Sequence, residues 1–207
     1  MKTISVKSFL IVAGLFAGSI MVNAQSLPVS FSGQFGYTVP QGGWFENAEG
    51  ESMTRFGLNV DFDALWHLER FNRRLGVGIT YNSSFLFGAD LGAGLDVGIY
   101  GLSLYGVKGQ WRFFNSRVSP YASLSLGLAR FSTPEVTMHV GGSSTVVAEA
   151  EHAFGFGVRP EIGIEFGVFV ISVGYIVPMN YTIGNDTYSA GGLQFSIGTR
   201  ISLFDRR

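Results

Sequence analysis

In several segments of this 207-residue chain, the charged residues fall on positions of one parity and apolar residues on the other. The spacing is clearest in "FGFGVRPEIGIEF" (residues 154–166), where Arg159, Glu161 and Glu165 share one parity. Side chains two positions apart on a β-strand lie on the same face. Carboxylates and guanidinium groups gathered there can form ion pairs or line an ion path. The candidate residues are Arg55, Asp61, Asp63, Lys108, Arg112, Arg159, Glu161, Glu165 and Arg200.

Histidine could supply a general base, and it occurs at positions 67, 139 and 152. A lipid A-modifying hydrolase needs a histidine, a serine nucleophile and an acid that converge. His139 lies near Ser143 and Ser144 in "MHVGGSS", which indicates a mobile Gly/Ser-rich loop, and the His-x-Ser spacing associated with such deacylases is absent at all three histidines. We therefore expect no catalytic, cofactor-binding or metal-binding residues, with hydrolysis kept as a second alternative.

Composition narrows the class of protein. The chain is 46% hydrophobic and only 14% charged, with a formal net charge of −1 and no cysteine. The absence of cysteine excludes disulfides and thiolate metal sites. The near-neutral charge gives no basic surface for nucleic acid, so no nucleic-acid partner is expected.

The first residues predict export. Lys2 and Lys7 precede an apolar run from Phe9 to Val22, and Val22-Asn23-Ala24 resembles a cleavage site. This pattern is typical of a secretory signal peptide. We expect residues 1–24 to be the signal peptide and residues 25–207 to form one domain.

Strand-type alternation extends over the whole predicted mature chain. Residues 96–113 alternate less cleanly than the other segments, because Leu102 and Leu104 fall on the polar parity. No segment after residue 25 is long and apolar enough for a membrane-spanning helix. The two-faced segments are residues 29–39, 55–66, 75–82, 96–113, 121–128, 154–166, 169–177 and 191–204.

The positions of the glycines indicate which face of the predicted strands meets the surroundings. The chain has 29 glycines, and most glycines within the segments, such as Gly106, Gly127 and Gly198, share the polar parity. Glycine on a solvent-facing side only weakens a strand, whereas an eight-stranded barrel has a narrow interior that needs small residues. The pattern predicts an all-β, eight-stranded antiparallel up-and-down transmembrane β-barrel with its apolar face in lipid. A secreted barrel for apolar ligands is disfavoured.

The connections between segments alternate in length. Long links at about residues 40–52, 85–95, 132–151 and 180–190 alternate with short links at 69–74, at 114–120 and around Gly167. Outer-membrane barrels have short periplasmic turns and long external loops. This alternation predicts that both ends of the barrel domain lie in the periplasm.

Aromatic residues gather near both ends of the predicted strands, as expected of interfacial belts. Trp44, Phe45, Tyr181 and Tyr188 are expected to be surface-loop contacts. The short-turn group is Trp66, Phe113, Phe114, Phe166, Phe169 and Phe204; the long-loop group is Trp44, Phe45, Tyr81, Phe131, Phe154 and Tyr181.

The last segment carries a family resemblance. "SIGTRISL" (residues 196–203) followed by Phe204 resembles the C-terminal assembly signal of the small Gram-negative outer-membrane β-barrels, the OmpA/OmpX-type and porin-like family. The resemblance implies recognition by the barrel-assembly machinery and localisation in the outer membrane. Asp205-Arg206-Arg207 follows where many members end on the aromatic residue. The signal residues are Ser196, Gly198, Ile201, Leu203 and Phe204.

Together these patterns predict a monomeric, non-enzymatic outer-membrane barrel. Charges in a narrow lumen should pair, so we expect a structural network centred on Arg159, Glu161, Glu165 and Arg200. The expected partners are outer-membrane lipid and lipopolysaccharide, and a host or envelope protein bound through the loops. The function is expected to be envelope integrity, adhesion or partner binding; the first alternative is a small-solute or ion channel.

Overall fold

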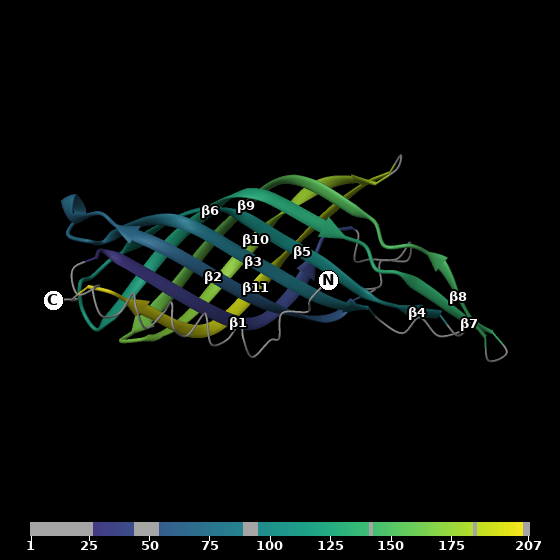
Figure 1. The fold of residues 1–207 in the computed structure, drawn as a ribbon, viewed down its shortest axis with the longest axis horizontal. Helices are drawn as coiled ribbons and strands as arrows, with labels where there is room; N and C mark the ends of the chain where they lie inside the picture. The colour runs from purple at the N-terminus through teal and green to yellow at the C-terminus, as the bar shows by residue number, and fades with distance from the viewer. Residues whose placement is uncertain (1–26, 44–53, 89–94, 141–142, 184–185, 205–207) are drawn as a thin grey trace, which may run out of the picture.

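Eight strands form a closed antiparallel barrel in the order β1-β11-β10-β9-β6-β5-β3-β2 (Figure 1). The computed structural model describes residues 27–43, 54–88, 95–140, 143–183 and 186–204. Pairing of β1 with β11 closes the barrel. The predicted fold class is therefore confirmed. The barrel strands are β1 (Val29–Gln41), β2 (Thr54–His67), β3 (Leu75–Gly88), β5 (Ile99–Arg112), β6 (Val118–Ser132), β9 (His152–Phe166), β10 (Phe169–Ile183) and β11 (Asp186–Ser202).

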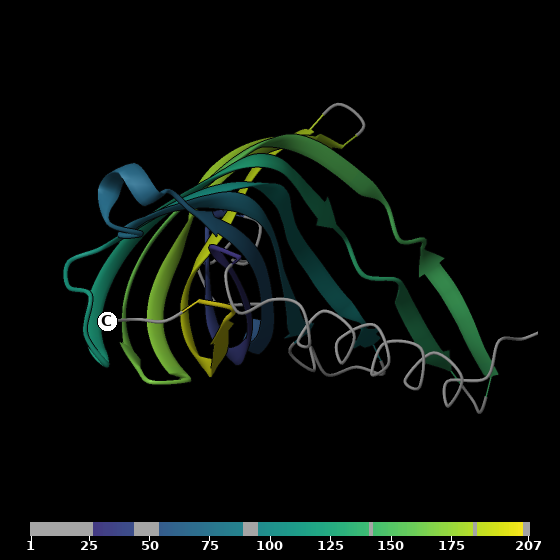
Figure 2. The ribbon, with the colours of Figure 1, turned by 60° about the vertical axis from the view of Figure 1, so that its left-hand side comes forward.

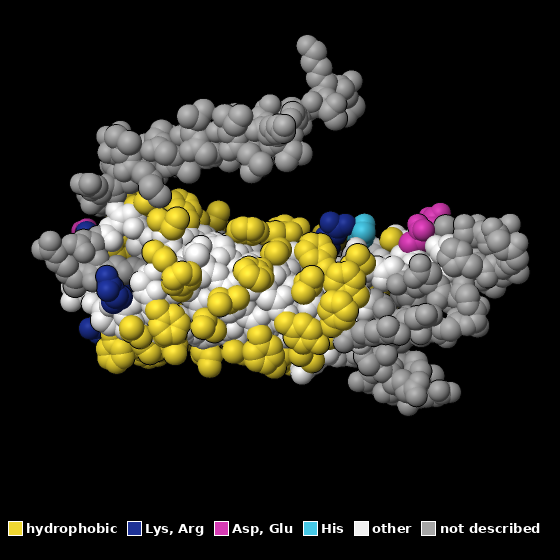
Figure 3. Space-filling view, turned by 90° about the horizontal axis from the view of Figure 1, so that it is seen from below, with side chains coloured by type: hydrophobic (Ala, Val, Ile, Leu, Met, Phe, Trp, Pro, Cys, Tyr) yellow, Lys and Arg dark blue, Asp and Glu magenta, His cyan; other side chains and the backbone are white. Residues whose placement is uncertain are grey.

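The side chains are distributed inside out relative to a water-soluble protein. On β1, Ser32 and Gln34 are buried in the interior, whereas Phe31 and Phe35 are exposed. Apolar side chains cover the visible outer wall (Figure 3). Because alternate residues of a strand point to opposite faces, the sequence alternation produces a polar interior and an apolar exterior. Within the described residues, no helix is long and apolar enough to cross a membrane.

A small sheet extends from one end of the barrel (Figures 1 and 2). Its strand order is β4-β7-β8, with β4 at Leu95–Val97, β7 at Val136–Val140 and β8 at Ser143–Ala148. The link over residues 132–151 is long, as predicted, but it is not an irregular loop, because it contains a β-hairpin paired with β4. The predicted segment 96–113 is likewise divided at Gly98, whose N–H donates to the carbonyl of Glu135.

The link predicted as a long loop over residues 180–190 is also different. β10 and β11 remain paired as far as Ile183 and Asp186, so the two strands themselves take up most of this link. The β10–β11 register shifts between Ile176 and Met179. Such a bulge inserts one residue and moves the following side chains to the other face of the strand. Ile176 and Tyr181 are consequently both buried despite their opposite parity.

The short connections lie together at the opposite end, where the short helix η2 (Glu69–Phe71) is also found (Figure 1). We call this end the turn end and the end with the small sheet the loop end. Gly167 turns the chain between β9 and β10 with a φ of +61°, a left-handed conformation that glycine adopts without strain. Asn72 and Arg73 turn the β2–β3 connection with φ values of 51° and 58°.

Glycine permits a close approach of β5 and β6. Gly106 and Gly127 are register partners. A Cβ on Gly127 would lie 2.1 Å from the carbonyl oxygen of Tyr105 and 2.5 Å from Cα of Gly106. Gly109 of β5, by contrast, has no atom within 4 Å of where its Cβ would be.

We predict that Gly127→Val lowers the free energy of unfolding by about 1–3 kcal/mol, the usual cost of overpacking. The same change at Gly109 is the matched control and should leave stability unchanged, because its side chain would enter open space. Urea unfolding of the refolded protein in lipid vesicles, followed by tryptophan fluorescence, measures both variants. Equal unfolding midpoints would contradict the prediction.

Candidate functional site in the barrel interior

Eight of the nine charged residues predicted for the interior have side chains in the described part of the chain, and all eight are buried. No one of them is more than 4% exposed. They comprise four acids and four bases, so their formal charges balance. The backbone of Arg55 belongs to β2, but its side chain lies outside the described part. We call the eight the interior network: Asp61, Asp63, Lys108, Arg112, Arg159, Glu161, Glu165 and Arg200.

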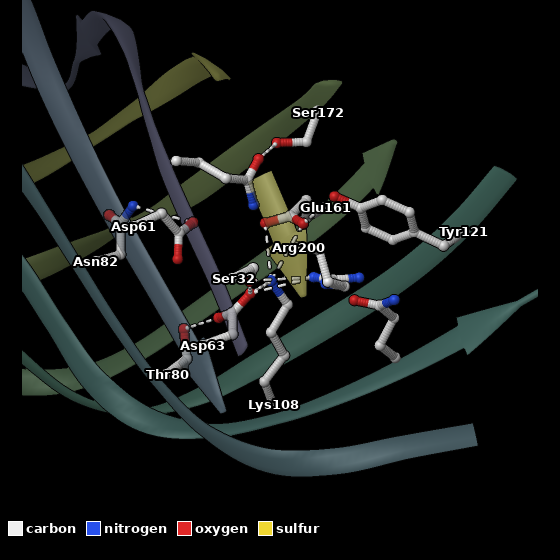
Figure 4. A network of polar contacts seen from close by, with 12 residues as sticks. Ser32, Asp61, Asp63, Thr80, Asn82, Lys108, Tyr121, Glu161, Ser172 and Arg200 are labelled. Atoms are coloured by element: carbon white, nitrogen blue, oxygen red, sulfur yellow. Dashed lines mark hydrogen bonds and ion pairs between the residues drawn. The ribbon is translucent and has the colours of Figure 1, made fainter. Parts of the chain in front are cut away.

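Lys108 of β5 links two distant strands across the interior (Figure 4). Its Nζ lies 2.7 Å from Oδ2 of Asp63 on β2 and 3.1 Å from Oε1 of Glu161 on β9. The hydroxyl of Tyr121 donates to the same Glu161 oxygen at 2.8 Å. These contacts cross the interior of the barrel and connect β2, β5, β6 and β9.

Arg159 extends the network toward the loop end. Its guanidinium contacts Oδ2 of Asp61 at 2.6 Å and Oε2 of Glu161 at 2.5 Å, and its Nε donates to Gln194 at 2.7 Å. Gln194 in turn donates to Asn82 and Ser84, each at 2.8 Å. Neutral polar side chains therefore adjoin the interior network on the side of Arg159.

The second half of the network surrounds Glu165 toward the turn end. Glu165 accepts from Arg200 and from Gln110, the latter at 3.0 Å, and lies 3.9 Å from Arg112. Arg200 also contacts Asp63 at 3.5 Å. Asp63 therefore joins the Arg200 group to the Lys108 group. The four residues predicted as the centre, Arg159, Glu161, Glu165 and Arg200, all belong to this connected network.

An apolar cluster, which the sequence reasoning missed, fills the interior on the loop side. Phe131 and Tyr181 pack with ring centroids 5.5 Å apart, and Tyr100 lies 6.5 Å from Phe131. The signal in the sequence was the placement of Leu102 and Leu104 on the polar parity. The cluster comprises Leu86, Tyr100, Leu102, Leu104, Ala129, Phe131, Ala153, Ile176, Tyr181 and Ala190.

This cluster corrects two predictions. Tyr181 was expected to be a surface-loop contact, but its side chain is 1% exposed because the β10 bulge turns it inward. Phe131 was expected in the outward belt, but it follows the interior parity of Tyr121 and is fully buried. Trp44 and Phe45 lie outside the described residues, as does the side chain of Tyr188, whose backbone pairs with Tyr181.

Phe204 closes the interior at the turn end. It was expected in the outward belt, but it shares the interior parity of Arg200 and is buried. Its ring centroid lies 4.9 Å from that of His67. The guanidinium carbons of Arg73 and Arg112 lie 5.3 and 5.5 Å from the Phe204 centroid, close enough for cation–π attraction.

The other predicted assembly-signal residues occupy both faces of β11 or follow it. Ser196 is buried and accepts from Asn59 at 2.8 Å. A Cβ on Gly198 would lie 2.1 Å from the carbonyl oxygen of Gly33, so glycine permits close approach of β1. Ile201 is exposed on the outer wall, and Leu203 is half-buried.

Two of the three histidines, His67 and His152, form different local arrangements, and the side chain of His139 lies outside the described part. His67 is buried, with Nε2 2.7 Å from Oγ of Ser30 and Nδ1 3.2 Å from the carbonyl oxygen of Arg73. His152 is exposed at the loop end, where its Nδ1 lies 2.7 Å from Oγ of Ser132. This Ser–His pair was not predicted. Among the hydrogen bonds of the described residues, no acid orients the His152 ring as the third member of a triad.

Comparison with known proteins identifies the fold. No protein-family model matches the sequence, and no curated protein matches it. Neisserial surface protein A (NspA) is 16% identical with a TM-score of 0.53, over 84% of this chain and 97% of that chain. Ail of Yersinia pestis, solved with a heparin analogue, is 16% identical with a TM-score of 0.49, over 84% of this chain and 100% of that chain. The N-terminal β-barrel domain of Pseudomonas aeruginosa OprF is 11% identical with a TM-score of 0.37, over 84% and 98%.

The chain therefore has the fold of the small eight-stranded outer-membrane β-barrel proteins, as the terminal strand predicted. At 16% identity, the similarity to NspA concerns the fold. Function has to be argued from the residues of this chain.

We predict that Glu161→Gln lowers the free energy of unfolding by about 3–5 kcal/mol, the cost of removing one partner of a buried ion pair. The variant leaves Lys108 and Arg159 without their shared carboxylate. Glu69→Gln is the matched control, because Glu69 forms an exposed pair with Arg73 of a kind usually worth about 0.5 kcal/mol or less. Urea unfolding measures both. A similar loss in the two variants would show that the interior pairs contribute no more than surface ones.

Proposed function

We propose that this protein is an integral outer-membrane β-barrel without enzymatic activity, with a closed interior and a loop end that serves envelope integrity, adhesion or partner binding. The observation that carries the proposal is the inside-out distribution of side chains. Exposed apolar residues such as Phe35, Ile79 and Ile162 surround an interior of paired charges. Lipid favours such an exterior, and a narrow barrel is filled by its own side chains.

Two layers support a closed interior. The interior network crosses the barrel through Lys108, and the apolar cluster around Phe131 lies on its loop side. An ion would have to break charge pairs and also cross an apolar region that offers no hydration. Conduction of ions or small solutes therefore requires both layers to open, which makes a channel the less supported function.

Hydrolysis of lipid A is supported less still. The exposed pair of Ser132 and His152 provides a nucleophile and a base. A Ser–His–acid triad also needs an acid on the second ring nitrogen and donors for the oxyanion. The hydrogen bonds of the described residues provide neither for His152.

The loop end is the surface that we propose for partners. The β4–β7–β8 sheet extends there, and exposed Glu135, Glu149 and Glu151 give it an acidic character. Lipopolysaccharide or a host or envelope protein would meet this surface first. The barrel-assembly machinery would instead recognise β11 through Ser196, Gly198, Ile201, Leu203 and Phe204 during biogenesis.

The closed interior predicts an electrically silent protein. The mature chain, refolded and inserted into a planar bilayer, should show no discrete conductance steps, because both layers block the ion path. A shift in gel mobility between boiled and unboiled samples checks folding. Reproducible openings that change in Glu161→Gln would contradict a closed interior and favour the channel.

In the orientation that we propose, the loop end faces the outside of the cell and the turn end faces the periplasm. This orientation predicts which positions are accessible from outside an intact cell. The chain has no cysteine, so single cysteines can be introduced without background labelling. Thr145 is an exposed residue of β8 at the loop end, and Glu69 is an exposed residue at the turn end. A membrane-impermeant maleimide should label Thr145→Cys but not Glu69→Cys. Labelling of Glu69→Cys alone would reverse the orientation.

A further inference from the structure

A groove of about 450 Å³ lies on the outer wall over β6, β9 and β10. It is lined mainly by apolar side chains, including Phe113, Pro120, Ile164, Phe166 and Ile171. Pro120, Ile164 and Ile171 form one cross-strand row. The short ring of Pro120 leaves room beside the two isoleucines, and Gly163 contributes no side chain to the lining. An acyl chain has the shape and polarity to occupy such a groove.

The turn next to this groove contains a cation, Arg117. Phe113 and Phe166 are among the residues that line the groove. Arg117 lies in the turn that connects Phe113 to Val118, and Val118 is the register partner of Phe166. The carbonyl of Arg117 accepts a hydrogen bond of 2.7 Å from the N–H of Gly167, which fastens two adjacent turns together. The Arg117 side chain is exposed and forms no ion pair with any residue in the described part of the chain.

The neighbouring turn adds two further arginines. Nδ2 of Asn115 donates to the carbonyl of Asn72 at 2.6 Å, which holds the β2–β3 and β5–β6 turns together. Arg70 is exposed, and Nε of Arg74 is buried without a hydrogen-bond partner among the described residues. The exposed acid in the described part of these turns is Glu69, which pairs with Arg73. The turn end therefore has an excess of positive charge, whereas the loop end carries exposed glutamates.

We propose that the groove and Arg117 bind an anionic glycerophospholipid of the periplasmic leaflet, with an acyl chain in the groove and the phosphodiester at the guanidinium. Arg70 and Arg74 belong to the β2–β3 connection and add to the positive charge of the turn end. The proposal rests on the outer-membrane placement proposed above. A lipid is the occupant that fits because the lining of the groove is apolar, while the adjacent turn carries Arg117, whose guanidinium group binds phosphate well.

The test titrates the refolded full mature chain in detergent with dioleoylphosphatidylglycerol or dioleoylphosphatidylethanolamine and counts bound lipids by native mass spectrometry. The wild-type chain should prefer the anionic lipid. Arg117→Gln should weaken binding of the anionic lipid about fivefold, the factor that corresponds to about 1 kcal/mol per arginine near an anionic headgroup. It should leave binding of the zwitterionic lipid unchanged.

Two further variants separate the groove from the charge. Val173→Phe places a larger side chain in the groove lining and should weaken binding of both lipids. Arg130 belongs to β6 and lies near the loop end. Arg130→Gln makes the same charge change as Arg117→Gln and should alter the affinity for neither lipid. The gel-mobility shift confirms that each variant has folded.

Equal affinity of the wild-type chain for the two lipids would overturn the proposal, as would equal losses in Arg117→Gln and Arg130→Gln. A folded chain that shows no lipid preference, but sediments with isolated peptidoglycan through Arg117, would assign the turn end to the cell wall instead. Failure of the proposed function is a different result: the wild-type chain would show no mobility shift and no insertion into bilayers.

Discussion

The charges inside the barrel must find their counter-charges within the protein, because a wall of eight strands encloses too little space for water to solvate them. Lys108 meets this constraint by contacting carboxylates on β2 and β9, on separate parts of the wall. Arg200 contacts Asp63 and Glu165 in the same way. Each pair therefore depends on the register of strands far apart in sequence. A shift of one residue in any strand would turn its charges to the outer face of the barrel and its apolar side chains inward.

The interior consists of three successive regions with different chemistry. Phe204 and His67 pack together at the turn end, the interior network occupies the next region, and the apolar cluster fills the loop side. The two ends of the barrel also differ in charge among the described residues, since the short turns carry Arg70, Arg74 and Arg117, whereas Glu135, Glu149 and Glu151 are exposed at the loop end. The closed interior proposed above and these chemically distinct ends together favour a function carried by the surfaces of the protein.

The sequence correctly predicted whether a side chain points into or out of the barrel where the two-residue period holds without interruption. Arg159, Glu161 and Glu165 lie on a regular stretch of β9, so parity placed all three correctly in the interior. Tyr181 was misplaced because the β10 bulge reverses the parity. Pro178 in "YIVPMNY" is a local signal of an interrupted ladder, but it does not give the size of the register shift. Phe204 was misplaced because a family pattern was followed instead of its own parity. The β4–β7–β8 sheet depends on pairing between two separate connections, which no local pattern reveals.

The most direct test of this account is to measure which face of β9 and its neighbour β6 meets lipid. Single-tryptophan variants, with Trp44, Trp66 and Trp111 replaced by phenylalanine, would carry Ile162→Trp or Tyr121→Trp in vesicles of brominated lipid. The two positions lie at similar depth, because Tyr121 pairs with Gly163, the residue after Ile162. The account predicts strong quenching at position 162 and little at position 121. Equal quenching, or stronger quenching at position 121, would contradict an apolar exterior around a charged interior.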